Sequence, residues 1–83
     1  MDINEFVDEL AKETNSKYII TYVKDYKWYV LTLYNPYISE SVIVTERVLR
    51  NKKTSFKRID LIKKLMESKE KFFEDRMKAY MED

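Results

Sequence analysis

The chain of 83 residues contains no cysteine, no histidine and no glycine, and it has one proline. Without cysteine there are no disulfides, thiolate nucleophiles or common structural zinc sites. Without histidine the commonest general base and metal ligand is missing, which removes most hydrolase, nuclease and transferase mechanisms. Without glycine no Gly-rich loop can bring backbone amides close to a phosphate, so Walker-type and Rossmann-type nucleotide sites are excluded. We expect neither catalysis nor a cofactor, a metal or a small-molecule substrate.

Long apolar runs are also missing. No stretch approaches the ~20 apolar residues that a membrane span requires, and the acidic N-terminus is unlike a signal peptide. The length and the 45% hydrophobic content predict one domain, residues 1–83, with one modest core. Heavy use of Lys, Ile, Tyr, Asn, Phe and Met suggests an AT-rich genome, such as that of a low-GC bacterium, its phages or some archaeal viruses. We expect a cytoplasmic protein, in the host cytoplasm if it is viral, with no membrane partner.

Charge is segregated along the chain although the formal net charge is only +1. Residues 1–46 hold four bases and eight acids, and residues 65–83 hold four bases and six acids. The segment between them, Arg47–Lys64, holds eight bases and one acid, Asp60, a formal charge of +7. We call this segment the basic strip. Its bases are Arg47, Arg50, Lys52, Lys53, Lys57, Arg58, Lys63 and Lys64.

The first half of the chain predicts a helix followed by a hairpin. Asp2 and Glu5 form a capping-box pattern, and the apolar residues after them are spaced as on one face of a helix. Together these indicate a helix over residues 3–14. Residues 17–24 and 27–34 are rich in aromatic and β-branched residues, as strands are, with Asp25-Tyr26 between them. A two-residue loop places Tyr22 opposite Tyr29, whereas a three-residue loop would exchange the faces of one strand.

The second half predicts a third strand and a long helical pattern. Asn35-Pro36 ends the second strand, and residues 41–49 are predicted to form the third, with Arg47 pointing outward. In a continuous strand, Glu46 would lie on the same, core-facing side as Val42 and Val44. Burial there conflicts with its charge. After a loop over residues 50–54, Ser55 is expected to cap a helix that extends toward Glu82.

The C-terminal half of this helical pattern is too long for the predicted sheet. A continuous helix of 28 residues would extend about 42 Å, whereas strands of eight residues span about 26 Å. Either the helix projects beyond the sheet, or it breaks near Ser68 and folds back as a third helix. A projecting helix would expose an apolar interface for a second copy of the chain. That oligomer interface would comprise Phe72, Phe73, Met77 and Tyr80, with Met81 beside them.

The predicted order of elements is helix, three antiparallel strands and one or two C-terminal helices. This is an α+β fold, with helices on one face of the sheet and the other face open. Trp28 and Tyr34 are expected on the open face. There they can stack unpaired bases, anchor a protein partner, or simply shield the sheet.

The basic strip is the strongest candidate site in the sequence. It is predicted to join the end of a strand to the first turns of a helix, where backbone amides add positive potential. Phosphate is the natural complement of such a surface, although a solvated basic face is the alternative. Acid-x-Lys patterns at Asp25–Lys27 and Glu67–Lys69 lack the further acids that a carboxylate nuclease needs for a metal.

Two family resemblances accompany these patterns. The segment Lys52-Lys53-Thr54-Ser55-Phe56-Lys57 and the element order resemble double-stranded-RNA-binding domains, which implies RNA contacts by Lys52, Lys53 and Lys57. The first ten residues, Met1–Leu10, and the element order are similar to small phage anti-CRISPR proteins that inhibit Cas9. That resemblance implies an inhibitor of nucleic-acid machinery and carries over no contact residue.

From these observations we expect a non-catalytic phage or mobile-element protein that binds and regulates nucleic-acid machinery through the basic strip. Two alternatives remain open at this point. One is a module that binds RNA or DNA directly, and the other is a homodimeric interaction protein.

Overall fold

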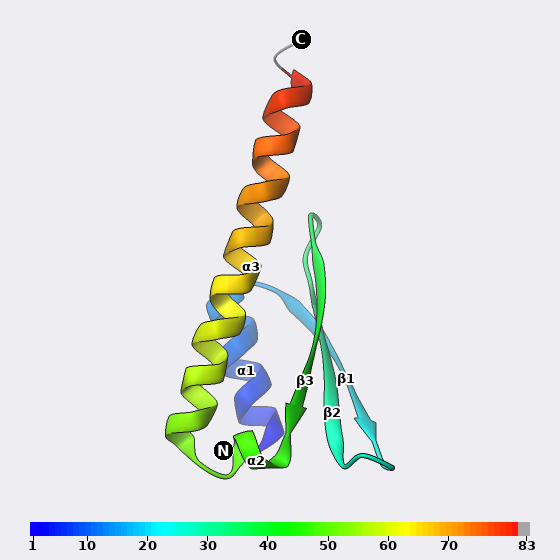
Figure 1. Ribbon diagram of the computed structural model, residues 1–83, viewed down its shortest axis with the longest axis vertical. Helices are drawn as coiled ribbons and strands as arrows, with labels where there is room; N and C mark the ends of the chain where they lie inside the picture. The colour runs from blue at the N-terminus through cyan, green and yellow to red at the C-terminus, as the bar shows by residue number, and fades with distance from the viewer. Residues whose placement is uncertain (82–83) are drawn as a thin grey trace.

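The computed structural model describes residues 1–81 as a three-stranded antiparallel sheet with helices on one face (Figure 1). The elements follow in the order α1 (Ile3–Thr14), β1 (Lys17–Val23), β2 (Trp28–Tyr34), β3 (Ser39–Thr45), α2 (Glu46–Leu49) and α3 (Lys52–Met81). The sheet order is β1-β2-β3, so each strand pairs with its neighbour along the chain. The predicted α+β class and element order are confirmed.

Helix α1 has the predicted bounds and the predicted cap. The Asp2 side chain accepts a hydrogen bond from the Glu5 amide, at 2.9 Å, and so satisfies one of the free amides of the first turn. The helix ends at Thr14, and the capping residue after it, Asn15, adopts a left-handed conformation with φ 50°. Asparagine takes the place of the glycine that usually follows a helix, because its short polar side chain tolerates this conformation.

The hairpin has the register expected for the two-residue loop, one of the two alternatives, but its turn is longer. Tyr22 pairs with Tyr29, but the last pair is Val23 with Trp28, so four residues, 24–27, form the turn instead of two. The amide of Lys27 donates to the Val23 carbonyl at 2.9 Å, and Lys27 adopts φ 56°. Opening the loop by one residue on each side leaves every side chain on its predicted face.

The third strand begins at Ser39, two residues earlier than predicted, and differs more from the prediction at its C-terminal end. Strand β3 ends at Thr45, and residues 46–49 form the one-turn helix α2. The Thr45 hydroxyl caps this turn by accepting from the Val48 amide at 3.4 Å. A helical turn buries Val48 and leaves Glu46 in solvent, whereas a continued strand would have directed Glu46 toward the core. The conflict between the charge of Glu46 and its expected core-facing position therefore marks the end of the strand.

The long helix begins earlier than predicted and is not broken. Asn51, not Ser55, caps α3, because its side-chain oxygen accepts from the Lys53 amide at 2.8 Å. Ser55 is fully buried and donates to the Val48 carbonyl at 2.9 Å, which fastens α3 to α2. The helix then continues through Ser68 to Met81, so the projecting alternative is correct. Glu82 lies outside the described residues.

One hydrophobic core joins the helices to the sheet. All eleven buried apolar side chains of residues 1–81 belong to a single cluster. They are Phe6, Val7 and Leu10 of α1, Leu31 and Leu33 of β2, Val44 of β3, Val48 and Leu49 of α2, and Ile59, Ile62 and Met66 of α3. Full burial of such a side chain contributes about 1.5 to 3 kcal/mol, so this cluster is the main source of stability.

Ser55→Ala should destabilise the fold by about 1 to 3 kcal/mol, because it leaves the buried Val48 carbonyl without its side-chain donor. Chemical denaturation followed by circular dichroism measures this loss. Ser68→Ala is the matched control, since Ser68 is exposed on the same helix and its loss should change stability by less than about 0.5 kcal/mol. Equal stability of the two variants would contradict a structural role for the Ser55 hydroxyl.

Candidate nucleic-acid interface

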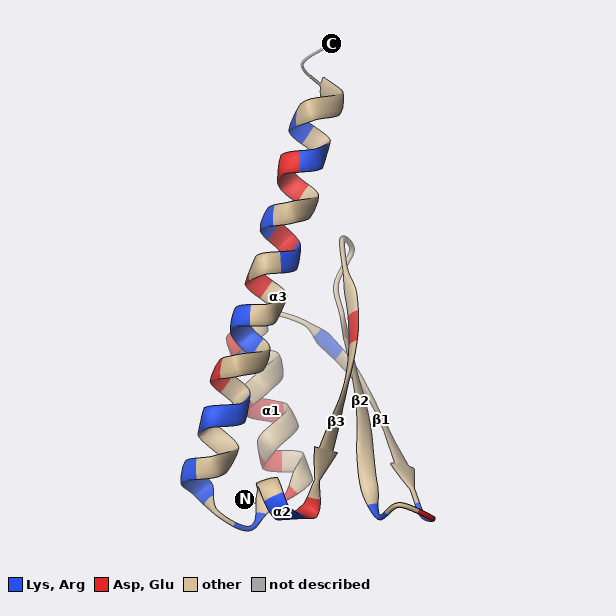
Figure 2. Cartoon of the chain, in the orientation of Figure 1, with Lys and Arg blue, Asp and Glu red and all other residues tan. Residues whose placement is uncertain are grey.

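Six cationic residues gather at one end of the molecule, where α2 meets α3 (Figure 2). We call them the basic corner: Arg47, Arg50, Lys52, Lys53, Lys57 and Arg58. All six are exposed. Arg47 lies on α2, Arg50 directly follows it, and the other four occupy the first two turns of α3.

The local fold explains why these cations lie together. Buried Val48 and Leu49 hold α2 against the core, and only Arg50 and Asn51 separate the two helices. The chain therefore turns sharply and brings Arg47 to the start of α3. Lys53 and Lys57 are four residues apart on α3, so they lie on the same helical face. No acidic residue occupies the first turn of α3 to offset them.

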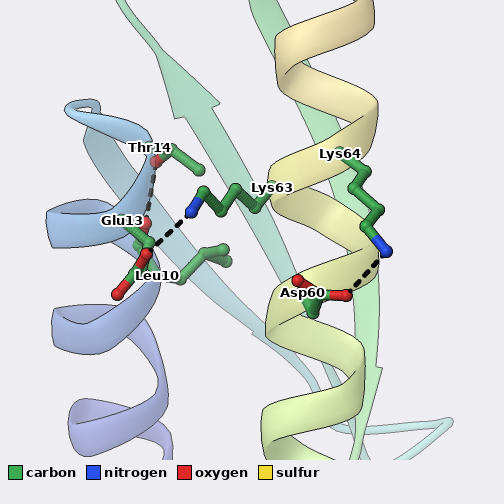
Figure 3. A network of polar contacts seen from close by, with 6 residues as sticks. All are labelled: Leu10, Glu13, Thr14, Asp60, Lys63 and Lys64. Atoms are coloured by element: carbon green, nitrogen blue, oxygen red, sulfur yellow. Dashed lines mark hydrogen bonds and ion pairs between the residues drawn. The ribbon is translucent and has the colours of Figure 1, made fainter.

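Lys63 and Lys64 belong to the basic strip but not to the basic corner. Lys63 reaches α1, where its Nζ lies 3.2 Å from a Glu13 carboxylate oxygen (Figure 3). Lys64 pairs with Asp60 one turn earlier, at 3.0 Å (Figure 3). Both lysines contact carboxylates of the same chain, although Lys64 remains exposed. The predicted eight-residue site therefore divides into two ion-paired cations and six that make no ion pair with a described residue.

The acidic side of α1 lies beside α3 and limits the positive surface on that side. Glu5, Asp8 and Glu9 line a hollow of about 280 Å³ together with Lys52 and Phe56. Further along α3, Glu9, Glu13 and Lys63 line a second hollow of about 200 Å³. Excess positive charge therefore faces away from α1. The sequence contained a signal for this contact, because α1 has an acidic outer face and α3 begins with a run of bases.

The open face of the sheet carries almost no charge. Residues paired across the strands share a face, and among the positions opposite the core only Lys17 is charged. These positions are Lys17, Ile19, Thr21, Val23, Trp28, Val30, Thr32, Tyr34, Ser39, Ser41, Ile43 and Thr45. Trp28 is half-buried and stacks on Tyr26, with ring centroids 4.6 Å apart and planes 13° apart. Tyr34 is more exposed.

The apolar residues expected at an oligomer interface do not share one surface. Phe73 contacts Tyr37 of the β2–β3 turn, with ring centroids 5.6 Å apart, and lines a groove with Met77. Tyr80 is exposed one turn further on. Phe72 does not line this groove and lies beneath the Arg76 guanidinium, 5.7 Å from its ring centroid.

The acids of residues 1–81 were the other candidates for a metal or catalytic site. This range contains no group of three acids that could hold a metal ion. Of the two acid-x-Lys patterns, one lies in the β1–β2 turn, and in the other Lys69 pairs with Glu40. No described helix has the length and apolar character needed to cross a membrane.

Comparison with known proteins gives no match to a family model, a curated protein or a solved structure.

The Glu13 carboxylate raises the pKa of Lys63 above its ordinary value of 10.5, chiefly by accepting its hydrogen bond. The charge of Glu67 acts in the same direction. A raised pKa in the folded state means that the pair stabilises the fold below pH 10.5, and that this contribution is lost as the pH rises through the pKa of folded Lys63.

Glu13→Gln should therefore lower the pKa of Lys63 toward its ordinary value, as measured by NMR titration of the Lys63 side chain. Glu9→Gln is the control, because Glu9 lines the same hollow without accepting from Lys63. If both substitutions move the Lys63 pKa equally, the direct contact is not its cause.

Proposed function

We propose that the protein is a non-catalytic regulator of nucleic-acid machinery that contacts the phosphate backbone of a nucleic acid through the basic corner. One observation carries the proposal: residues 47–58 contain six bases and no acid, and all six bases are exposed. No carboxylate lies within this segment. Lys52 shares a hollow with acids of α1, and the other five cations make no ion pair with a described residue, which leaves them available to an anionic partner.

Phosphate is a better complement than a carboxylate surface for this arrangement. A nucleic-acid backbone offers a regular line of negative charges, and each cation that neutralises one releases condensed counterions. The cations extend from α2 across the corner and along two turns of α3, so they can contact several phosphates in succession. Four of them start α3, where the helix dipole favours anions.

A role as an inhibitor or regulator of nucleic-acid machinery accords with the sequence resemblances. The likeness of the first ten residues to phage anti-CRISPR proteins points to a target in which nucleic acid is held by protein. The segment that resembles double-stranded-RNA-binding domains supplies three members of the basic corner, Lys52, Lys53 and Lys57. The target can thus be a free nucleic acid or the nucleic acid of a nucleoprotein, and the same phosphate chemistry serves both.

The binding test uses fluorescently labelled single-stranded RNA, single-stranded DNA and duplexes at low salt. Binding should weaken linearly in log[salt], with a slope of about −0.9 per neutralised duplex phosphate. Lys53→Glu/Lys57→Glu should weaken binding at least tenfold and reduce the slope. Neither residue makes an ion pair with a described residue, so the fold should remain intact.

Lys24→Glu/Lys71→Glu is the matched control, because it makes the same change in net charge at exposed positions outside the corner. At 0.1 M salt, binding by this control should stay within about threefold of the wild-type value, since screening there confines surface charge effects to about 10 Å. Equal losses in the two variants would make the effect one of net charge and would overturn the corner as the site.

A second arm measures DNA cleavage by guide-RNA-loaded Cas9 in the presence of the wild-type protein and the two variants. Inhibition that disappears in Lys53→Glu/Lys57→Glu and persists in the control assigns the target to a nucleoprotein. Binding without inhibition assigns it to free nucleic acid. Failure to bind any nucleic acid at low salt, together with no inhibition, would reject the proposed function.

A further inference from the structure

The apolar stripe by which α3 joins the core continues past the elements that cover it. Met66 on this stripe is 1% exposed, whereas Met77 is 43% exposed and Tyr80 is 74% exposed. Met66 and Met77 have the same side chain, so the difference reflects the loss of cover beyond the end of α1 (Figure 1). We call residues 70–81 of α3 the overhang. Its length is about 18 Å at 1.5 Å per residue.

A groove of about 590 Å³ lies at the base of the overhang. Phe73 and Met77 form its helical side, and Asn15, Pro36 and Tyr37 form the opposite side. The β2–β3 turn is fixed in this position, because the Asn35 amide donates to the Glu70 carboxylate at 2.9 Å. The groove therefore has a fixed shape. Its apolar lining residues, Pro36, Tyr37, Phe73, Met77 and Met81, continue the core stripe between polar and charged ones.

We propose that the occupant of this groove is the overhang of a second copy of the chain. In this dimer the two overhangs pack side by side, antiparallel, about a two-fold axis near Arg76. Each overhang covers the stripe of the other, and each tip reaches the groove of the other copy. The pairing goes beyond the proposed nucleic-acid contact and does not depend on it.

The shape of the molecule favours the antiparallel direction. The sheet and α1 lie on the same side of α3 as the stripe, and the overhang alone extends past them (Figure 1). Parallel pairing through this stripe would bring α1 and the sheet of both copies into the same space. Antiparallel pairing places these parts at opposite ends of the dimer and lets the exposed stripes meet.

The charges beside the stripe favour the same arrangement. Glu74 and Lys78 both line the groove, so they lie on one flank of the stripe. A two-fold axis between the helices and perpendicular to them places the same flank of each helix side by side. The two helices then run in opposite directions. With the axis near Arg76, Glu74 faces Lys78 of the second copy, and the symmetry makes this pair twice.

Sedimentation equilibrium over a range of protein concentrations tests the dimer with a charge exchange. Glu74→Lys and Lys78→Glu should each weaken self-association at least tenfold, because each places like charges opposite each other. An equimolar mixture of the two variants should associate within threefold of the wild-type constant, since the mixed dimer restores both opposite-charge pairs. Glu74 and Lys78 of one chain are also four residues apart on the same helix. Loss of a contact between them within one chain cannot explain the rescue, because each chain in the mixture still lacks that contact.

Met77→Glu should abolish association, whereas Leu61→Glu should leave it unchanged. Leu61 is exposed on α3 and does not line the groove, so it controls for adding a carboxylate to an apolar position of the helix. Circular dichroism establishes that each variant is folded. A wild-type protein that stays monomeric at every concentration, or a mixture of the charge variants that fails to associate, would overturn the proposal.

Discussion

The packing of one stripe of α3 against both α1 and the sheet is the constraint on which the rest of the structure depends. A three-stranded sheet has two faces, and this chain has helices for only one of them. Ile59, Ile62 and Met66 lie in the same cluster as Leu31 and Leu33 of the central strand, so α3 closes the core over the middle of the sheet. Removing that contact would expose the core-facing side of the three-stranded sheet and leave the short helix α1, which is not stable alone in water. The positions of the basic corner and of the groove both follow from where this stripe begins and ends.

The first half of the fold was predictable because its signals are local. The Asp2 cap, the helical spacing and the alternation in the hairpin each act within a few residues. The register was narrowed to two alternatives, and the structure has the one that a two-residue loop gives. At the junction between β3 and α3 the conflict at Glu46 was a local signal that the strand ends, but the structure that follows was not predictable from such signals. Val48 suits a strand or a helical turn equally well, and Ser55 looks like a cap although it is a buried donor to Val48. Only the tertiary contact between α2 and α3 distinguishes these possibilities.

The candidate site was predictable in composition but not in extent. A charge count located the basic strip, but it could not reveal that Lys63 would reach Glu13 on another helix. Which cations remain exposed depends on how α1 lies against α3, and that arrangement is set by the core. In the proposed dimer the two basic corners lie at opposite ends, about 70 Å apart at 1.5 Å per helical residue. Such a dimer would contact two separate places on one long nucleic acid or on a large nucleoprotein.

The continuity of α3 gives its two halves different thermodynamic behaviour. The first half is held by the core and can open only when the whole domain unfolds. From Glu74 to Met81 the helix has only eight residues with little cover, fewer than an isolated helix needs to persist in water. This end can therefore open locally, by a transition that exposes no core residue. Filling the groove shifts the helix–coil equilibrium of this end toward helix. At this end of the molecule, binding in the groove and formation of the helix are therefore coupled.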